Sequence, residues 1–501
     1  MSRTVAMIMA GGKGSRLAPL TCHRAKPAVP FGGRFRIIDF VLSNFLNSGY
    51  RQIYVLTQYM SSSLIQHLNR NWHISGMNAF VEVVPAQMRM GSHWYRGTAD
   101  SIFQNINLIL DARADNVAVF GGDHIYKFDV QKMEEEHIKH NSDLTVAAFP
   151  VPRSEAHQFG VIEVDENGNI LKFWEKPKNP IPMPGHPDTC LVSMGNYFFK
   201  ADLLVDAVSD DASDPGSAHD FGRNIIPKLL RSGHKLRVYN FGDNKIRGES
   251  PDALPYWRDV GTLDSFFVAN MEIRNPLPTF NLYNRSWRIR TANRDYPPAR
   301  FVREGAKQPA DVIDSMVCEG SIIESTVLDR SLIGYDCFIH SGSKVETSLI
   351  FSGCDIGRGV HLKKVLFDKN CSIAPGVEMG VDPETDRLRF PFITSSGLIV
   401  LPKGTHVPKE GPIEFTRDIY DLLYQDPAAR EFLDQFEGEI SIAERRRHSY
   451  ASAGPRFRQY SGEPSPASAA NLIPAASAEE TDSHSSTLLD AAAEVEVVEE
   501  D

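Results

Sequence analysis

The sequence predicts an α/β domain with a Rossmann-like, mixed sheet, followed by a parallel β-helix of hexapeptide-like repeats. Over residues 1–275, apolar segments of strand length alternate with segments of helical periodicity, which is the pattern of an α/β fold. Between residues 311 and 415, residues of one kind return every 17 positions, which is typical of a solenoid. A chain of 501 residues is also too long for one compact core, so two domains are expected.

The elements of the first domain follow from the period of its apolar residues. Residues 5–10 are apolar throughout and end at two glycines, so they predict a buried strand. Residues 37–46 carry apolar side chains at helical spacing, and Gly49 marks the end of this helix. The same reasoning predicts strands at 53–56 and 117–120 and helices at 64–68, 99–110, 203–208 and 221–230.

A β-hairpin is predicted in the middle of this domain. Residues 161–164 and 170–173 are two short strand patterns, and the segment DENGN at 165–169 joins them. Asn and Gly adopt the backbone conformations that tight hairpin turns require. Because a hairpin is antiparallel, it makes an otherwise parallel sheet mixed.

The second domain is predicted from its repeats. Three segments of about six residues, with one position deleted, make one coil of a hexapeptide β-helix. Apolar columns then stack inside the coils and glycines turn the corners. Spacing leaves the hand open, and resemblance to hexapeptide repeats suggests a left-handed coil. The columns are Leu332, Leu349 and Leu366; Cys337, Cys354 and Cys371; Ile339, Ile356 and Ile373; Gly342, Gly359 and Gly376; and Val345, Leu362 and Met379.

The cysteine column could be interpreted as a metal site. Its three members come from successive coils, however, and none has a second Cys or His at the spacing of a zinc site. Small side chains stacked in an apolar core explain the column better. We therefore interpret these cysteines as structural.

Composition assigns the remaining segments. We expect a linker at 276–310, the β-helix domain at 311–415 and a helical extension at 416–440. Residues 441–501 are rich in Ala, Ser, Pro and Glu without periodicity, which predicts a disordered acidic tail. This tail accounts for most of the net charge of −11, since residues 461–501 contain ten acidic residues and no basic one.

Several function classes are disfavoured by composition. The chain has no basic surface pattern typical of nucleic-acid binding. It also has no apolar run near the roughly 20 residues that span a bilayer. Its first apolar segment is shorter than that of a secretory signal. We expect a cytoplasmic protein with six reduced cysteines that binds neither nucleic acid nor membrane.

The first chemical signal is the segment AGGKGSRL at 10–17, directly after the predicted strand. Gly11, Gly12 and Gly14 lack a Cβ, so backbone N–H groups can approach a phosphate or a nucleobase closely. Lys13 and Arg16 add positive charge. A lone glycine-rich loop is more often a simple turn, and neither the P-loop nor the dinucleotide-binding pattern fits here.

The continuation of this loop resembles a known family. Residues 10–28, with RLAPLT and RAKPA, resemble the N-terminal signature of the sugar-nucleotide pyrophosphorylases. The form RAKPAVPFGGRFRIIDF at 24–40 resembles the branch that makes ADP-glucose. Further matches follow in family order at 94–100, 121–126, 159–161, 175–177, 193–195, 220–222 and 256–262.

The resemblance implies a nucleotidyltransferase domain that transfers AMP from ATP to glucose 1-phosphate, for glycogen-type α-glucan synthesis. It implies that Arg16 and Lys26 act catalytically on the triphosphate, beside the glycines of the loop. It implies that Asp123, at a strand end, and Asp259, far along the chain, hold Mg²⁺, an ion that prefers carboxylate oxygens. Asp123 is then both catalytic and a metal ligand.

The same resemblance implies a glucose 1-phosphate site. Lys176 would bind the sugar phosphate as a point charge, and Glu175 would accept hydrogen bonds from sugar hydroxyls. Tyr95, Gly160 and Ser193 would line the pocket. No histidine is given a special role.

Regulation is implied as well. Members of this branch are commonly homotetramers that respond to allosteric metabolites where the N-terminal loop meets the β-helix. His23, Arg34, Arg36 and Arg51 are the candidate effector contacts. Many bacterial members have a basic residue where this chain has His23, and a neutral imidazole holds an anion weakly above pH ~6.5. The identity of the activator therefore stays open.

Three alternatives remain at this point. The first is a pyrophosphorylase for another sugar nucleotide, and the second is a non-catalytic regulatory subunit, although the basic and acidic site residues are all present. The third is an acyltransferase, because hexapeptide coils also build these enzymes around a histidine. His340 and His361 lie in different columns, so we expect a scaffold instead.

Overall fold

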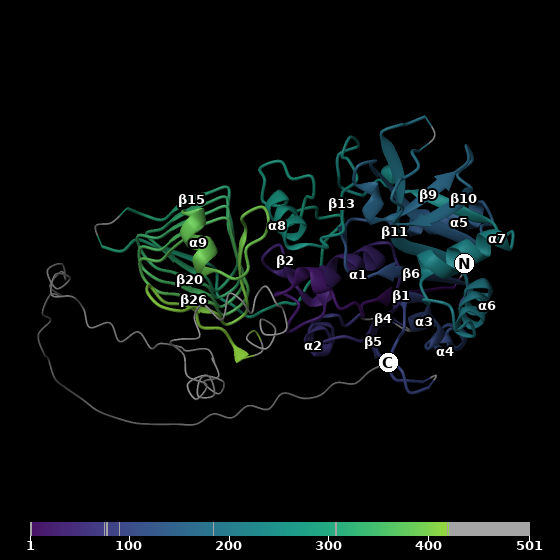
Figure 1. Ribbon diagram of the computed structural model, residues 1–501, viewed down its shortest axis with the longest axis horizontal. Coiled ribbons are helices and arrows are strands. Elements are labelled where there is room, and N and C mark those ends of the chain that lie inside the picture. The colour runs from purple at the N-terminus through teal and green to yellow at the C-terminus, as the bar shows by residue number, and fades with distance from the viewer. Residues whose placement is uncertain are drawn as a thin grey trace, which may run out of the picture. The chain divides into compact units, whose positions relative to one another are not determined.

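The structure is a computed structural model that describes residues 3–74, 76, 79–89, 91–183, 185–305, 308–417 and 419 (Figure 1). An α/β domain comes first along the chain, and a solenoid of short parallel strands follows it. The predicted helical extension at 416–440 lies almost entirely outside the described residues, and the predicted tail at 441–501 lies entirely outside them.

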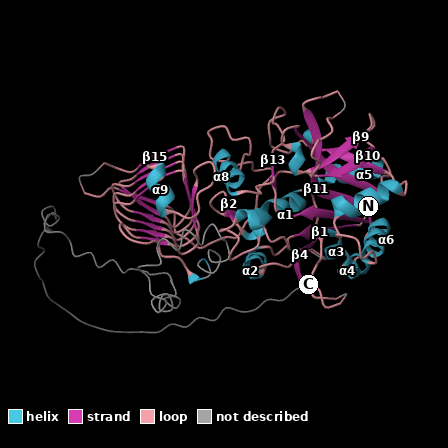
Figure 2. Cartoon of the chain, viewed as in Figure 1, coloured by secondary structure: helices cyan, strands magenta, loops and turns pink. Residues whose placement is uncertain are grey.

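One mixed sheet of nine strands forms the centre of the α/β domain (Figure 2). Its strands are β1 (Thr4–Met9), β4 (Gln52–Thr57), β5 (Phe80–Pro85), β6 (Asn116–Gly121), β8 (Leu144–Pro152), β9 (Gly160–Val164), β10 (Ile170–Glu175), β11 (Thr189–Lys200) and β12 (Leu236–Asn240). β1 pairs in parallel with β4 and β6, and β4 pairs in parallel with β5. β11 is antiparallel to β6, β8 and β9, and β9 and β10 form the predicted hairpin. The prediction of a mixed sheet is confirmed.

Helices cover both faces of this sheet. On one face, α1 (Ile37–Asn47), α2 (Ser62–Asn71) and α5 (Val130–Lys139) contribute to one buried apolar cluster. On the other face, α3 (Thr98–Phe103), α4 (Ile106–Asp111), α6 (Ala201–Ala212) and α7 (Ile226–Arg231) contribute to a second one. Alternate residues of the strands enter the two clusters, as the period of two requires.

The predicted single helix at 99–110 is instead two helices, α3 and α4. The break falls at Asn105, whose side-chain nitrogen donates hydrogen bonds to the Ser101 carbonyl at 2.8 Å and the Tyr95 hydroxyl at 2.9 Å. An amide side chain that bonds to the nearby backbone competes with regular helical hydrogen bonding. The apolar period alone could not reveal this break.

A small ribbon joins two distant parts of the chain. β7 (Ile125–Tyr126) pairs with β13 (Trp257–Arg258) in antiparallel fashion. A second ribbon pairs β2 (Pro30–Phe31) with β3 (Phe35–Arg36), directly before α1. Helix α8 (Leu263–Glu272) begins a few residues after β13. The first of these ribbons brings residues near 123 and near 259 together.

The solenoid consists of three parallel sheets, as predicted for a β-helix. The first contains β14 (Arg300–Val302), β17 (Ile322–Glu324), β20 (Phe338–Ile339), β23 (Asp355–Ile356), β26 (Ser372–Ile373) and β29 (His406–Val407). The second contains β15 (Asp311–Ile313), β18 (Val327–Asp329), β21 (Lys344–Glu346), β24 (His361–Lys363) and β27 (Glu378–Met379). The third contains β16 (Met316–Val317), β19 (Leu332–Ile333), β22 (Leu349–Ile350), β25 (Val365–Phe367) and β28 (Ile399–Leu401). β14 lies inside the predicted linker, so strand pairing begins before residue 311.

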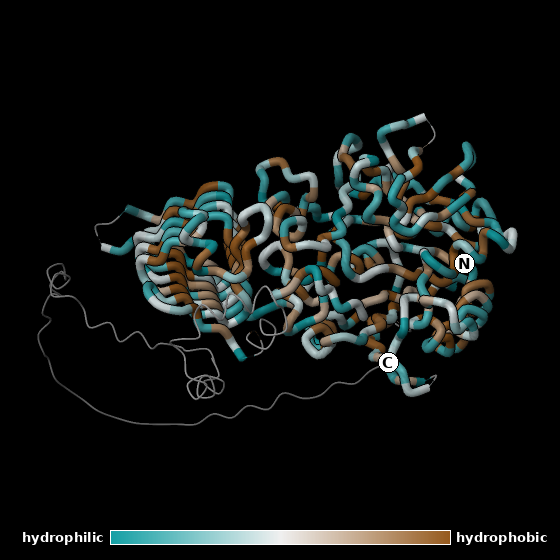
Figure 3. The backbone as a smooth tube through the Cα atoms, viewed as in Figure 1, coloured by the Kyte–Doolittle hydropathy of each residue, from teal (hydrophilic) through white to brown (hydrophobic). Residues whose placement is uncertain are grey.

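The repeat of 17 residues is the register of these sheets. Leu332 pairs with Leu349, which lies opposite Leu366 in the next coil. The apolar columns are buried, whereas the glycines at the corners are exposed, and Figure 3 shows hydrophobic stripes stacked along the coils. After Met379 the period is lost, because α9 (Pro383–Arg389) is inserted before β28.

The cysteine column lies in the apolar core of the solenoid. Cys337, Cys354 and Cys371 are each 1% exposed, and their thiols donate hydrogen bonds to backbone carbonyls. Burial raises the pKa of Cys337 and Cys354 well above the ordinary value. Such thiols are neutral and inert, which agrees with a structural role.

The two domains share one buried apolar cluster. Leu17 and Val260, beside the candidate site, and Ile125 of β7 lie in the same cluster as Leu349 and Leu366 of the solenoid. Loops that carry candidate site residues are therefore anchored against the β-helix. None of the helices in the described part of the chain combines the length and apolar character needed to cross a bilayer.

Candidate active site

The glycine loop begins where β1 ends. Gly14 has φ +64°, a conformation that favours glycine, and a Cβ built there would lie 2.8 Å from the Lys26 Cβ. A Cβ on Gly11 would lie 3.2 Å from the Gln58 Cβ, whereas Gly12 has no such neighbour. The loop thus lies close against the segment that carries Lys26.

Lys26 connects the two predicted metal carboxylates. Its Nζ donates to Asp123 Oδ2 at 3.0 Å, to the Asp259 carbonyl at 2.9 Å and to Asp259 Oδ1 at 3.3 Å. The side chain of Lys26 is 7% exposed, so its ammonium group is desolvated and paired. Three predicted site residues from distant parts of the chain therefore meet at one point.

The fold explains why they meet. Met9 at the end of β1 lies opposite Gly121 at the end of β6, so the loops that follow these strands leave the same edge of the sheet. Asp123 follows β6, and the β7–β13 ribbon then brings Asp259 beside it. Ligands of α/β sheets commonly bind at this carboxyl edge.

The charges of this cluster are coupled. Burial alone would raise the pKa of Asp123, but the charge and hydrogen bond of Lys26, together with His124, outweigh this effect and hold the pKa below its ordinary value. Burial also opposes ionisation of Asp259, yet hydrogen bonding to His124 and the charge of Lys26 lower its pKa. Burial would lower the pKa of Lys26, and the two aspartates raise it. All three groups are charged at neutral pH.

His124 is a site residue that the sequence did not predict. Its Nε2 lies 3.6 Å from Asp123 Oδ1 and 3.5 Å from Asp259 Oδ1, and its ring packs edge-on against Trp257. One ligand atom from each of the three residues lies within 4.8 Å of the others. Its position next to Asp123 in the GDH motif was the available signal.

Two carboxylates around one cation fit a divalent metal. The Lys26 ammonium lies between Asp123 and Asp259, and thus demonstrates that this position accepts positive charge. Carboxylate oxygens are the donors that Mg²⁺ prefers, commonly one or two from the protein. The residues present therefore fit this ion.

Arg16 lies at the rim of the cluster. A Cβ added to Gly261 would lie 3.1 Å from Arg16 Nη2 and 2.6 Å from Asp259 Oδ2. Glycine at 261 thus leaves the space that the guanidinium group and the carboxylate occupy. Arg16 itself is exposed, so it can reach a bound anion.

The predicted sugar-phosphate residues form a neighbouring group around the β9–β10 hairpin. Gly160 pairs with Glu175, and a Cβ at 160 would meet the Glu175 carboxylate at 3.1 Å. Lys176 follows with φ +49°, and its exposed Nζ lies 3.7 Å from Glu175 Oε1. Burial, followed by the nearby charge of Asp220, raises the pKa of Glu175. Ser193 Oγ accepts a hydrogen bond from the Gly195 N–H at 3.2 Å.

This group adjoins the carboxylate cluster. Trp257 contacts the ring of His124 on one side and that of Phe159 on the other, at centroid distances of 5.5 and 5.4 Å. A Cβ on Gly195 would lie 3.9 Å from His124 Cε1. Tyr95 is fixed through its backbone N–H, which donates to Gln58 Oε1 at 2.8 Å, beside the glycine loop.

The four candidate effector residues are not all together. Arg36 donates to the Ser63 carbonyl at 2.7 Å, whereas Arg51 donates to the carbonyls of Leu46 and Tyr50. These arginines flank opposite ends of α1, which at 11 residues is about 16 Å long. Arg34 lies 3.5 Å from Glu319 of the solenoid, and His23 is half-buried in the loop.

A basic cluster surrounds Arg36 at the junction of the domains. Arg24 makes a buried bidentate ion pair with Asp368 of the solenoid, with both N–O distances 2.9 Å. Burial and the charges of Arg24 and Arg36 lower the pKa of Lys369 to about 7. Burial lowers the pKa of Arg36 to about 10. The charge of Asp39 opposes this shift, and the charges of basic neighbours such as Arg24 add to it. The charge of Arg294 adds to both shifts, and neither Arg294 nor Lys369 was predicted, because only the fold brings them here.

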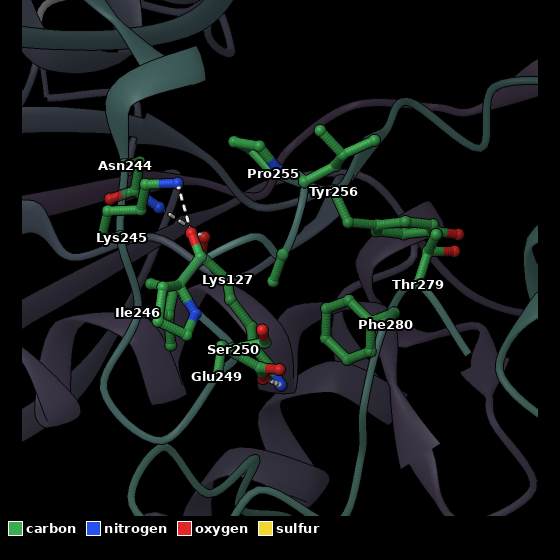
Figure 4. A pocket seen from close by; sticks show the side chains of 13 residues that line it. Lys127, Asn244, Lys245, Ile246, Glu249, Ser250, Pro255, Tyr256, Thr279 and Phe280 are labelled. Carbon is green, nitrogen blue, oxygen red and sulfur yellow. Dashed lines mark hydrogen bonds and ion pairs between the residues drawn. The ribbon is translucent and has the colours of Figure 1, made fainter. Parts of the chain in front are cut away.

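A cavity of about 270 Å³ is lined by Lys127, directly after β7, and by Tyr256, directly before β13 (Figure 4). Lys127, which directly follows β7, is paired there with Glu249. No predicted site residue lines this cavity. Its lining is Lys127, Asn244, Lys245, Ile246, Glu249, Ser250, Pro251, Ala253, Leu254, Pro255, Tyr256, Thr279 and Phe280.

Known proteins resemble this chain over both domains. Residues 5–276 match the family model of the nucleotidyl transferases, and residues 297–401 match that of the GlmU-like C-terminal hexapeptide. The glucose-1-phosphate adenylyltransferase of Thermus thermophilus is 48% identical over 404 residues, which cover 79% of this chain and 97% of the relative. Proteins of the same name are 45% identical over 408 residues in Aliivibrio fischeri (81% of this chain, 100% of the relative) and 46% over 404 residues in Leifsonia xyli (80% and 97%).

Proposed function

The chain belongs to the glucose-1-phosphate adenylyltransferase family of nucleotidyl transferases, and on this premise we propose that it transfers AMP from ATP to glucose 1-phosphate. The products are ADP-glucose and pyrophosphate, which makes the chain a source of the glucosyl donor for α-glucan synthesis. The observation that carries the proposal is the meeting of Lys26, Asp123 and Asp259 at one edge of the sheet.

The reaction forms one bond and breaks another at the α-phosphorus of ATP. An oxygen of the sugar phosphate attacks, and the bond to the pyrophosphate group breaks. Because two polyanions must be aligned, the protein contributes mainly position and positive charge. Lys26, at the carboxylates, and Arg16, at the rim, would bind the triphosphate and the departing pyrophosphate. The glycine loop would let the nucleotide approach the backbone.

Asp123 and Asp259 would hold the proposed Mg²⁺. When bound, this ion supplies positive charge that phosphate oxygens share. Lys26 and His124 together keep both carboxylates ionised, so they are ready to act as ligands at neutral pH. Gly261 leaves the room that Asp259 needs.

Glucose 1-phosphate would bind beside them. Lys176 is exposed and reaches the solvent, so its ammonium can take the sugar phosphate. Glu175, beside it, offers carboxylate oxygens to sugar hydroxyls. Tyr95, Gly160 and Ser193 would form the walls.

Control by metabolites also remains part of the proposal. The basic cluster of Arg24, Arg36 and Lys369 supports an anionic effector at the junction of the domains. Arg51 does not join this cluster, so an effector that contacts it would need a different site. A homotetramer and a cytoplasmic location stay predictions from the sequence.

A nucleotide screen tests the proposed reaction. The purified full chain is incubated with glucose 1-phosphate, Mg²⁺ and each of ATP, UTP, dTTP, CTP and GTP, and pyrophosphate release is measured. We expect ATP to be used best. A strong preference for UTP or dTTP would overturn the assignment.

The substitution Asp123→Asn tests the site. Loss of one carboxylate charge should lower kcat at least about 100-fold, as losses of single electrostatic groups commonly do. The melting temperature should stay near that of the wild type, since Lys26 keeps its hydrogen bonds to the carbonyl and carboxylate of Asp259. Asp202→Asn, an exposed aspartate on α6, is the matched control and should keep full activity. Near-normal turnover of Asp123→Asn would refute the metal assignment.

A further inference from the structure

We infer that Asp264 of α8 is the polar link through which the β-helix holds Asp259 in its working position, beside the apolar packing of Phe266 on Phe351. This inference rests on the proposed function, because it assigns a positioning residue to the proposed metal site. Asp264 touches neither the carboxylate cluster nor Lys26. It acts through the loop 259–262, which leads from the cluster into α8.

Asp264 is bound to the solenoid by two hydrogen bonds. Its Oδ1 accepts from Thr394 Oγ1 at 2.7 Å and from Ser396 Oγ at 2.6 Å. Both hydroxyls belong to a tight turn before β28, closed by the Gly397 N–H donating to the Thr394 carbonyl at 2.9 Å. One acceptor atom on the α/β domain thus meets two donors fixed on a coil of the β-helix.

The position of Asp264 fixes the start of α8. Thr262 is the N-cap residue, and its Oγ1 accepts from the Ser265 N–H at 3.2 Å while its own N–H donates to Ser265 Oγ at 3.0 Å. This capping box makes the first turn of the helix rigid. The hydrogen bonds at Asp264 therefore also restrain the position of Thr262, three residues after Asp259.

The loop between Asp259 and Thr262 is strained. Val260 has φ +43°, in the left-handed region, and a β-branched residue there is a true outlier. Its side chain is 1% exposed, in the apolar cluster that both domains share. Such a conformation persists only where the surroundings over-determine it.

Both ends of this loop must then be held. The β7–β13 ribbon holds the first end, since Arg258 pairs with Ile125. The start of α8, tied to the solenoid by Asp264, holds the second. Release of the second end lets Val260 relax, and Asp259 then moves relative to Lys26 and Asp123.

The test measures metal binding without turnover. Binding of Mn²⁺, a spectroscopic substitute for Mg²⁺, to the full chain is followed by electron paramagnetic resonance. We expect Asp264→Ala to weaken Mn²⁺ binding about three- to tenfold. Asp264→Asn should bind Mn²⁺ like the wild type, because its amide oxygen can still accept both hydrogen bonds. The pair T394V/S396A should reproduce the effect of Asp264→Ala.

The combined variant supplies the decisive comparison. D264A and T394V/S396A remove opposite partners of the same two hydrogen bonds. The combined variant D264A/T394V/S396A should therefore bind Mn²⁺ no more weakly than D264A alone. Thr385→Val removes a solvent-exposed hydroxyl bond to Asp382 in the same domain and should leave binding unchanged. Melting temperatures and circular dichroism verify that every variant is folded.

Several results would overturn the inference. The first is a D264A variant that binds Mn²⁺ as tightly as the wild type. The second is an equal loss of Mn²⁺ affinity in D264N and D264A. The third is a loss in the combined variant equal to the product of the losses in D264A and T394V/S396A. Absence of Mn²⁺ binding to the wild type would overturn it as well. The expected pattern in a protein that forms no ADP-glucose would support the inference and reject only the proposed reaction.

Discussion

At the scale of single residues, Lys176 is the sharpest probe of substrate binding. Its ammonium is exposed beside Glu175, at the end of β10, and it does not take part in the carboxylate cluster. We expect Lys176→Ala to raise KM for glucose 1-phosphate about 10- to 100-fold with little change in kcat, since a charged hydrogen bond contributes about 1.5–3 kcal/mol.

Steady-state kinetics with varied glucose 1-phosphate at saturating ATP checks this expectation. Lys172→Ala is the matched control, because Lys172 is exposed on the same strand. It should leave KM unchanged. A loss in kcat with an unchanged KM would place Lys176 at the reacting groups instead of the bound sugar phosphate.

Lys369 makes stability depend on pH. Burial and the charges of Arg24 and Arg36 lower its pKa to about 7, whereas an unfolded lysine titrates near 10.5. Between these pH values the unfolded chain binds the extra proton, so the contribution of this group to stability rises with pH. Relative to Lys369→Met, the wild type should gain ~1–2 kcal/mol in unfolding free energy from pH 7 to pH 9.

Urea unfolding of both proteins at pH 7 and pH 9 measures this difference. Lys363→Met, which replaces an exposed lysine of the same coil, should show no such change with pH. The unfolding free energy of the wild type minus that of Lys369→Met should rise with pH. A fall of this difference between pH 7 and pH 9 would contradict the lowered pKa. Phosphate should reduce the effect, because a bound anion favours the charged lysine.

At the scale of elements, the glycine loop can be tested through Gly14. A Cβ there would lie 2.8 Å from the Lys26 Cβ, on a residue with φ +64°. Gly14→Ala should therefore cost about 1–2 kcal/mol of stability and displace Lys26, which lowers kcat. Gly12→Ala is the control for stability alone, since a Cβ at 12 has no neighbour within 4 Å. Equal melting temperatures of the two variants would contradict the close approach.

The elements that depend on local pattern were predictable from the sequence. The β-helix follows from its period of 17, and the hairpin at 161–173 follows from its turn chemistry. The break between α3 and α4 could not be predicted, because it depends on a hydrogen bond from Asn105 to Tyr95, ten residues earlier. Insertion of α9 likewise left no trace in the period before it.

In the candidate site, too, some features could be predicted from the sequence and others depend on long-range contacts. Family motifs identified Lys26, Asp123 and Asp259, and the structure brings them together, while their roles stay proposals. The adjacency of His124 to Asp123 in the chain hinted at a site role but not at contact with Asp259, and nothing in the sequence placed Lys369 beside Arg36. These placements arise from the ribbon β7–β13 and from the packing of the solenoid on the N-terminal loop, which are long-range features.

At the scale of the whole molecule, the catalytic domain and the β-helix are linked by burial. Leu17 and Val260 share an apolar cluster with Leu349 and Leu366, and Arg24 pairs with Asp368 across the junction. Both partners of this pair are almost fully buried, at 5% and 0% exposure. Unfolding of either domain would expose the apolar cluster to water and leave one charge of the buried ion pair without its partner. The two domains should therefore unfold together.

The five tryptophans make this cooperativity measurable. Four lie in the α/β domain, and the fifth, Trp287 of the predicted linker, is buried against that domain and donates to Asn44 of α1, so their fluorescence reports on the α/β domain. Asp368→Asn, a change in the solenoid, should leave Arg24 buried without its counter-charge and cost about 3 kcal/mol. The tryptophan transition should then shift to lower temperature by the same amount as the circular dichroism of the strands. Asp355→Asn, at an exposed carboxylate of the same solenoid, should shift neither. If Asp368→Asn lowered the transition temperature seen by circular dichroism but left the tryptophan transition unchanged, the two domains would unfold independently. The β-helix would then be unable to hold the loops of the active site in place.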